Sequence, residues 1–123
     1  MAEGSAQFHE DPKDLKQKTI ERHRAVVSLM EELEAVDWYD QRVDASKDEE
    51  LRVILAHNRD EEMEHAAMVL EWLRRNSSVM DEQLREYLFK DGPIIDSNHG
   101  GGHDHDGAEQ NDGSLNIGSL RED

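Results

Sequence analysis

The sequence predicts an all-α fold in which an antiparallel hairpin of two long helices is followed by a short third helix. We expect the hairpin to dimerise into a four-helix bundle. Apolar residues recur at helical spacing in two stretches, and no Gly or Pro lies between Pro12 and Ala45. Between the stretches, Ser46-Lys47-Asp48-Glu49 has the Ser-x-x-Glu form of a capping box, which ends one helix and starts another within a few residues.

The first predicted helix runs from about Pro12 to Ala45. Asp11 suits an N-cap and Pro12 the first helical position, while Asp14 suits the positive end of the helix. Such a helix is roughly 50 Å long at about 1.5 Å per residue. Residues 1–11 are polar and are expected to form a mobile lead.

The second predicted helix returns antiparallel over residues 47–76. Serines at 77–78 offer a cap for a third helix over residues 79–90, which the sequence Asp-Gly-Pro at 91–93 ends. The predicted helical domain therefore spans residues 12–91.

The composition changes after residue 91. Seven of the eight glycines lie beyond it, with seven acidic residues and no Phe, Trp or Tyr. We interpret residues 92–112 as a flexible linker rich in Gly, His and Asp. Residues 113–123 carry three spaced aliphatic side chains, Leu115, Ile117 and Leu120, as expected of a short docking peptide.

Composition limits the possible partners. The net charge of −16 argues against nucleic acid and anionic membranes and favours cations as ligands. There is no cysteine, so a metal site must use oxygen and imidazole ligands. No apolar run is long enough for a membrane span and no leader is recognisable, so we expect a cytoplasmic protein. With 36% charged and 5% aromatic residues in 123, the chain predicts a thin core and an oligomer.

Polar residues interrupt both apolar stripes at matching levels. Glu32 lies in the first stripe, and Glu62 and His65 lie in the second. The remaining stripe residues are Ala25, Leu29, Val36, Tyr39 and Val43 on the first helix, and Leu51, Leu55, Asn58, Val69 and Trp72 on the second. Burying unpaired carboxylates costs several kcal/mol, so the pattern predicts a compensating cation.

A Glu on one helix and a Glu-x-x-His on another make up half of a di-metal carboxylate site, and two chains would supply both halves. This ligand set suits iron or manganese, with zinc as a competitor that undergoes no redox chemistry. Alternatively, the two glutamates are solvated or pair with Arg or Lys, and His65 is an ordinary packed histidine.

Several segments resemble the encapsulated ferritins, the cargo ferroxidases of encapsulin nanocompartments. The matching segments are residues 30–39, 57–62, 65–68, 70–72, 87–89 and 92–94. The terminal Gly-Ser-Leu-Asn-Ile-Gly-Ser-Leu also resembles an encapsulin targeting peptide, which would make the encapsulin shell protein a partner of residues 113–123.

The resemblance implies that two protomers pair into a ferritin-like four-helix bundle and that dimers assemble into a ring of ten subunits. It implies that Glu32, Glu62 and His65 bind two irons per dimer and oxidise Fe(II) to Fe(III). The shell would store the iron, because an open ring has no enclosed mineral cavity.

Further residues are secondary candidates. Glu31 and Glu34 of this chain resemble carboxylates that lie on the iron entry route in the family. Their spacing also fits a solvent-exposed helix face. Tyr39 shares the Glu32 stripe and would hydrogen-bond a ligand or donate an electron, with core packing as the alternative. The row His57, Glu61 and Glu64 matches a weak surface cation site. His99, His103 and His105 would capture metal in the linker, or else simply belong to a solvated tether.

Two functions other than a ferroxidase remain open on the sequence. The same ligands would bind zinc or iron without turnover in a metal buffer or a zinc-bridged dimer. Alternatively, the chain is chiefly a docking adaptor whose metal is incidental.

Overall fold

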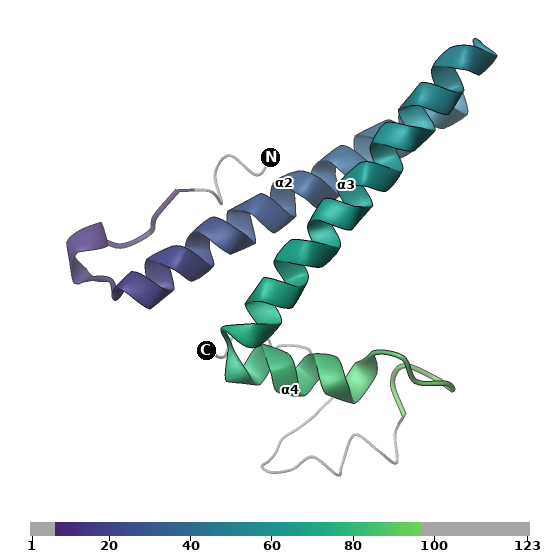
Figure 1. The fold of residues 1–123 in the computed structure, drawn as a ribbon. Helices are drawn as coiled ribbons and strands as arrows, with labels where there is room; N and C mark the ends of the chain where they lie inside the picture. Colours follow the sequence, from purple (N-terminus) through teal and green to yellow (C-terminus); the bar gives the residue numbers. More distant parts are fainter. Residues whose placement is uncertain (1–6, 97–123) are drawn as a thin grey trace. The chain divides into compact units, whose positions relative to one another are not determined.

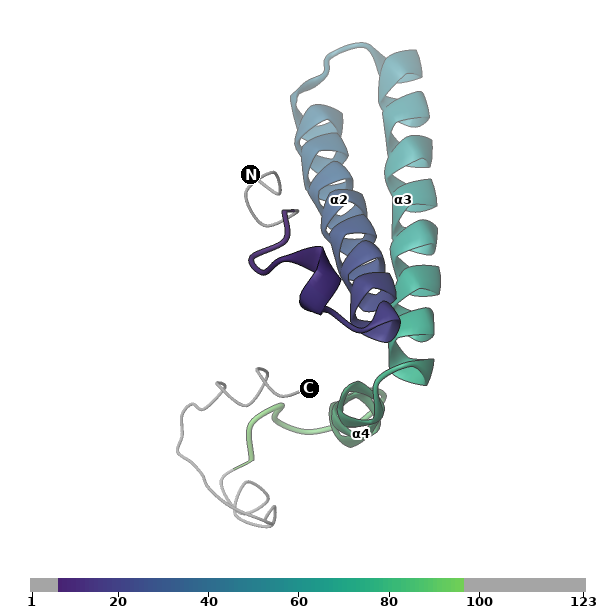
Figure 2. The ribbon, with the colours of Figure 1, turned by 90° about the vertical axis from the view of Figure 1, so that its left-hand side faces the viewer.

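The computed structural model describes residues 7–96 of the chain, and these residues form helices and no strand. A short 3-10 helix, η1 (Pro12–Asp14), precedes two long α-helices, α2 (Gln17–Ala45) and α3 (Glu49–Arg75), and the shorter α4 (Ser78–Tyr87). Helices α2 and α3 lie side by side and antiparallel, joined by a three-residue turn (Figures 1 and 2). The predicted all-α class and helical hairpin are therefore confirmed.

The first long helix begins later than the sequence indicates. Asp11 does cap a helix, since its side chain accepts a hydrogen bond from the Lys13 amide at 3.0 Å. The amides of Asp14 and Leu15 bond three residues back, which is the 3-10 pattern. This pattern rarely extends beyond three or four residues because its hydrogen-bond geometry is poor. The chain is extended at Leu15 and Lys16, so α2 starts at Gln17 rather than Pro12.

The turn between the long helices uses Asp48 as its cap, not Ser46. The Asp48 carboxylate accepts from the Leu51 amide at 3.0 Å, and α3 starts at Glu49 rather than Lys47. Ser46 instead ends α2, donating its amide to the Arg42 carbonyl. The amino-terminal end of a helix carries a partial positive charge that carboxylates stabilise. Asp48, Glu49 and Glu50 all lie at this end of α3.

The chain divides into two compact units between Asn76 and Ser77. In the second unit, Ser77 caps α4 by accepting a hydrogen bond from the Met80 amide at 3.2 Å. Helix α4 ends at Tyr87, three residues before the predicted end at Lys90. Leu88 is extended and Phe89 adopts a φ of +60°, so the chain leaves the helix before it reaches the glycine at residue 92.

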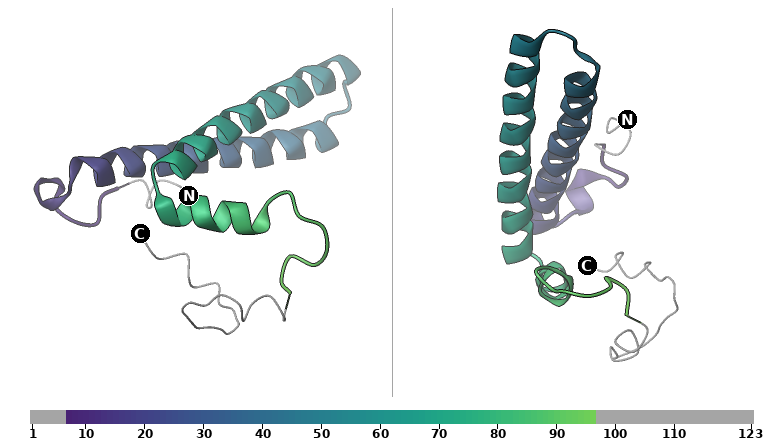
Figure 3. Two further views of the ribbon diagram at one scale, coloured as in Figure 1. Left: turned by 60° about the horizontal axis from the view of Figure 1, so that its bottom comes forward. Right: turned by 90° about the vertical axis from the view of Figure 1, so that its right-hand side faces the viewer.

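The hairpin has almost no core of its own. Of the hydrophobic side chains in residues 7–96, only Ala66 and Leu73 are buried, and both belong to α3. Nine large apolar side chains of the hairpin remain exposed: Val26, Leu33, Trp38, Leu51, Val53, Ile54, Met63, Met68 and Trp72. The two views of Figure 3 show α2 and α3 running side by side.

Candidate metal centre

Two long helices supply the candidate ligands. Glu32 lies near the middle of α2, while Glu62 and His65 lie on α3. Residues three apart on a helix lie on one face, so Glu62 and His65 both reach toward the same point. The antiparallel pairing brings Glu32 opposite them, as the matching levels of the two stripes predict.

The three side chains converge in space. His65 Nδ1 lies 3.5 Å from Glu32 Oε1 and 3.5 Å from Glu62 Oε1. One potential ligand atom from each residue lies within 4.8 Å of the other two. Within residues 7–96, no other group of three His, Asp or Glu side chains meets this geometry. The arrangement offers one imidazole and two carboxylates to a single cation.

The electrostatics of the cluster favour a positive charge between the carboxylates. The pKa of Glu32 is raised, chiefly by a hydrogen bond with the Glu62 carboxyl group, then by burial and by the Glu62 charge, while His65 acts in the opposite direction. Burial would lower the pKa of His65, but the charge of Glu32 and the hydrogen bond with Glu62 outweigh it and raise the pKa. A divalent cation would relieve this crowding of negative charge.

Residues 7–96 do not enclose the cluster. The side chains of Glu32 and Glu62 are each 26% exposed, and that of His65 is 42% exposed. The sequence predicts burial for the carboxylates, and the single chain achieves only part of it. The remaining exposure follows from geometry, because two helices cover only one side of each other.

The secondary candidates do not join the cluster. Tyr39 lies on α2 seven residues after Glu32, and the Arg42 guanidinium lies over its ring at 5.2 Å. Glu31 is exposed and Glu34 half-buried on either side of the Glu32 position. His57 pairs with Glu61 at 3.6 Å. Glu64 does not form with His57 and Glu61 a three-ligand group as close as that of Glu32, Glu62 and His65.

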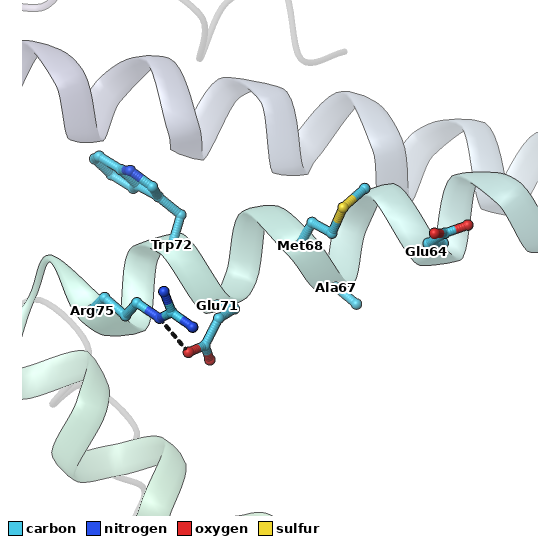
Figure 4. Close-up of a pocket in the computed structure, with 6 residues that line it drawn as sticks. All are labelled: Glu64, Ala67, Met68, Glu71, Trp72 and Arg75. Atoms are coloured by element: carbon cyan, nitrogen blue, oxygen red, sulfur yellow. Dashed lines mark hydrogen bonds and ion pairs between the residues drawn. The ribbon is translucent and has the colours of Figure 1, made fainter.

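A shallow hollow of about 420 Å³ lies along the second half of α3 (Figure 4). Its lining consists of Glu64, Ala67, Met68, Glu71, Trp72 and Arg75. None of the cluster residues contributes to it, and its acidic residue Glu71 is already engaged by Arg75 at 2.7 Å. The hollow is therefore not the metal centre.

Part of the predicted machinery lies outside the described residues. This applies to most of the predicted linker 92–112, with His99, His103 and His105, and to the docking peptide 113–123. Conversely, the structure reveals two exposed apolar positions on α3, Ile54 and Met68, that the predicted stripe omits. Their spacing of three from Leu51 and from His65 is the heptad signal that would have found them.

A helical hairpin with a carboxylate–histidine cluster between its helices corresponds to half of a ferritin-like four-helix bundle. The chain belongs to the EncFtn-like family, whose model matches residues 7–91. The resemblance to encapsulated ferritins is thereby confirmed. Membership supports an iron-related, ferritin-like function for the chain.

Individual relatives cover nearly the whole chain. It is 60% identical to an "Encapsulated ferritin-like protein" of Rhodospirillum rubrum, over 98% of this chain and 92% of that protein. It is 55% identical to a "Ferritin-like protein" of Thermotoga maritima, over 93% of this chain and 97% of that protein. A crystal structure of a Nitrosomonas europaea protein matches with a TM-score of 0.70 and 56% identity, covering 72% of this chain and 98% of the other.

None of the helices described within residues 7–96 is both long enough and apolar enough to cross a membrane.

Proposed function

We propose that the protein is a ferroxidase that oxidises Fe(II) to Fe(III) at a di-iron site formed between two copies of the chain. The observation that carries the proposal is the convergence of Glu32, Glu62 and His65 within 4.8 Å. These residues are the proposed ligands and the proposed catalytic groups.

One chain supplies only half of such a site. Di-iron carboxylate bundles use a Glu from each of two helices and a Glu-x-x-His from each of the other two. This chain provides one Glu on α2 and one Glu-x-x-His on α3. A second copy, related by two-fold symmetry, would provide the same set and complete a four-helix bundle.

A seam on α3 that runs through the cluster, apolar at both ends and polar at its centre, favours this pairing. It consists of Leu51, Ile54, Asn58, Glu61, His65, Met68 and Trp72, which repeat on α3 with the three- and four-residue spacing of a coiled coil. Ile54 is 51%, Met68 57% and Trp72 39% exposed in the single chain. A facing helix pair would cover these side chains and the open side of His65 together, so dimerisation and completion of the site would be one event.

The ligand chemistry fits iron as the substrate. Two copies would supply four carboxylates and two imidazoles, a set that also suits manganese and, without redox chemistry, zinc. Carboxylates stabilise Fe(III) more than Fe(II), which favours loss of an electron. Each Fe(II) loses one electron, so two ions supply two electrons, which with two protons would reduce dioxygen to hydrogen peroxide or hydrogen peroxide to water.

Neighbouring residues would assist this reaction. The hydroxyl of Tyr39, on the same stripe as Glu32, would hydrogen-bond a ligand or donate an electron. Glu31 and Glu34 flank Glu32 and would attract Fe(II) toward the site. His57, Glu61 and Glu64 would form at most a weak surface site, and His99, His103 and His105 would collect metal in the linker.

We also propose that the protein is the cargo of an encapsulin shell inside the cytoplasm and assembles as a decamer of five dimers. The name of the Rhodospirillum rubrum relative and the terminal sequence of residues 113–123 support this location. Co-expression with an encapsulin shell protein tests it. Removal of residues 113–123 should leave the protein outside the shell, and unchanged encapsulation would contradict the targeting role.

The ferroxidase proposal is tested by mixing Fe(II) with the protein in air and following Fe(III) absorbance. Wild type should exceed buffer, whereas Glu32→Ala should fall to the buffer rate. Glu82→Ala is the matched control, because Glu82 is an exposed glutamate on α4. Equal rates for wild type and Glu32→Ala would overturn the proposal, and tight zinc binding without oxygen consumption would support the non-catalytic metal-binding alternative.

A further inference from the structure

An ion pair links the two long helices close to the metal centre. Arg59 on α3 donates from Nη1 to Asp40 Oδ1 on α2 at 2.9 Å. Its Nε donates to Asp60 Oδ1 at 3.1 Å, so the guanidinium is held by two carboxylates. The hydrogen bonds with Asp40 and then Asp60 raise the pKa of Arg59 above its ordinary value. The side chain is partly buried against the hairpin.

Few hydrophobic side chains are fully buried between α2 and α3, so polar contacts are well placed to help fix how far one helix slides along the other. Ala66 and Leu73 are the only hydrophobic residues buried within the described hairpin. Apolar packing is non-directional, whereas a guanidinium bonds a carboxylate only in particular orientations. A slip of one residue would shift a helix by about 1.5 Å and turn its side chains by about 100°. In some coiled coils a single buried polar residue specifies helix register.

The ion pair occupies the same two helices as the proposed ligands. Arg59 precedes Glu62 by three residues, which is less than one helical turn. Asp40 follows Glu32 by eight residues along α2. Because a helix is rigid over this distance, fixing Asp40 against Arg59 also fixes Glu32 against Glu62 and His65.

Two other arginines cross the hairpin farther from the ligands. Arg22 Nη1 donates to the Asn76 carbonyl at 3.0 Å, and Arg52 Nε donates to the Val43 carbonyl at 2.9 Å. Asn76 lies eleven residues after His65, and Arg52 lies ten residues before Glu62. Of these three arginine contacts, the one between Arg59 and Asp40 is nearest to the cluster along α3.

We propose that Asp40 and Arg59 are positioning residues for the metal centre, which set the axial offset of α2 against α3 and thereby the spacing of Glu32 from Glu62 and His65. They do not touch the metal themselves. This inference rests on the proposed metal-binding function of the cluster.

The test measures Co(II) binding to the full-length, metal-free protein, because the visible spectrum of Co(II) reports ligand geometry as well as affinity. Asp40→Asn and Arg59→Gln should each weaken binding on the order of tenfold, the effect typical of residues that orient metal ligands. Each should also alter the Co(II) spectrum. The double variant should lose no more affinity than either single variant, because both changes break one contact.

Arg24→Gln is the matched control. It removes the same charge as Arg59→Gln and breaks an ion pair, Arg24–Glu21 at 3.1 Å, that stays within α2. It should leave Co(II) affinity and spectrum unchanged. If Arg59→Gln does not fold, Arg59→Lys replaces it, and an affinity between those of wild type and Asp40→Asn is expected.

Two results separate the possible failures. If Asp40→Asn binds Co(II) with wild-type affinity and spectrum while Glu32→Ala binds poorly, the positioning role is overturned and the metal centre stands. The same holds if the two single losses add in the double variant. If Glu32→Ala binds Co(II) as well as wild type does, the proposed metal-binding function itself fails.

Discussion

His65 on α3 and Glu32 on α2 approach to 3.5 Å, so a cation held by both would join the two helices of the hairpin. The contact matters because few hydrophobic side chains are fully buried in the hairpin, with only Ala66 and Leu73 buried among those described. Metal binding should therefore be linked to the stability of the folded chain as well as to its proposed chemistry.

Metal should stabilise the wild-type protein and not a ligand variant. A ligand at one hundred times its dissociation constant adds about 2.7 kcal/mol to the free energy of unfolding. We expect Co(II) to raise the thermal midpoint of wild type and to have little effect on His65→Gln, as measured by circular dichroism. An equal shift in both proteins would mean that the metal binds elsewhere.

A charge placed in the exposed seam should prevent pairing. Ile54→Asp puts a carboxylate at an apolar end of the seam, next to Leu51, and burying it unpaired against a second copy would cost several kcal/mol. We expect monomers by native mass spectrometry and loss of ferroxidase activity. Val53→Asp is the control, because Val53 is also exposed on α3 but lies outside the seam. Loss of the dimer in both variants would argue against this seam as the interface.

The ion pairs in the carboxyl-terminal turn of α3 should stabilise the protein less in acid. Hydrogen bonds from Arg74 and then Arg75 lower the pKa of Glu71 to about 2 from an ordinary value of 4.5. The pKa of Glu71 is lower in the folded chain than in the unfolded chain, so the ionised carboxylate stabilises the folded state. This stabilisation is complete above about pH 4.5 and is lost as the pH falls toward 2. Glu71→Gln should therefore unfold more easily than wild type at pH 6 but not at pH 2. The contribution is small because the group is solvent-exposed.

A direct check of that prediction is the titration of the Glu71 carboxyl carbon by nuclear magnetic resonance. A midpoint near the ordinary value would contradict the arginine pairing.

The cap of α3 should contribute measurably to stability. Asp48→Ala removes the hydrogen bond to the Leu51 amide and should lower the free energy of unfolding by about 1 kcal/mol. Ser46→Ala should cost less, because Ser46 accepts only a longer 3.3 Å hydrogen bond from the Asp48 amide within the turn. Urea unfolding of the two variants measures the difference. A larger loss for Ser46→Ala would restore Ser46 as the principal cap.

The hairpin and its cluster could be predicted from the sequence because periodicity and spacing determine them. Glu62 and His65 face one way on any helix, and the short turn places Glu32 at their level. The helix ends could not be predicted as well, since Ser46 and Asp48 are both competent caps and only the folded turn selects Asp48. The early break at Leu15 likewise depends on a 3-10 turn that the residues Asp11 and Pro12 permit but do not require.

The residue of α2 that pairs with Arg59 also could not be predicted from the sequence. Asp60 is adjacent and acidic residues are abundant, so the choice of Asp40 depends on the register of the hairpin. The partial exposure of the ligands also could not be predicted. A stripe of apolar residues indicates which face of a helix is apolar but not how many chains are needed to cover that face.

The central claim is that each chain holds half of the site, and specific activity measured against oligomeric state tests it most directly. Ferroxidase rate per chain and native mass should be recorded together over a dilution series that dissociates the dimer. We predict that activity falls in proportion to the dimer fraction and vanishes for monomers, with two irons bound per dimer. A rate per chain that stays constant while the protein becomes monomeric would contradict the account.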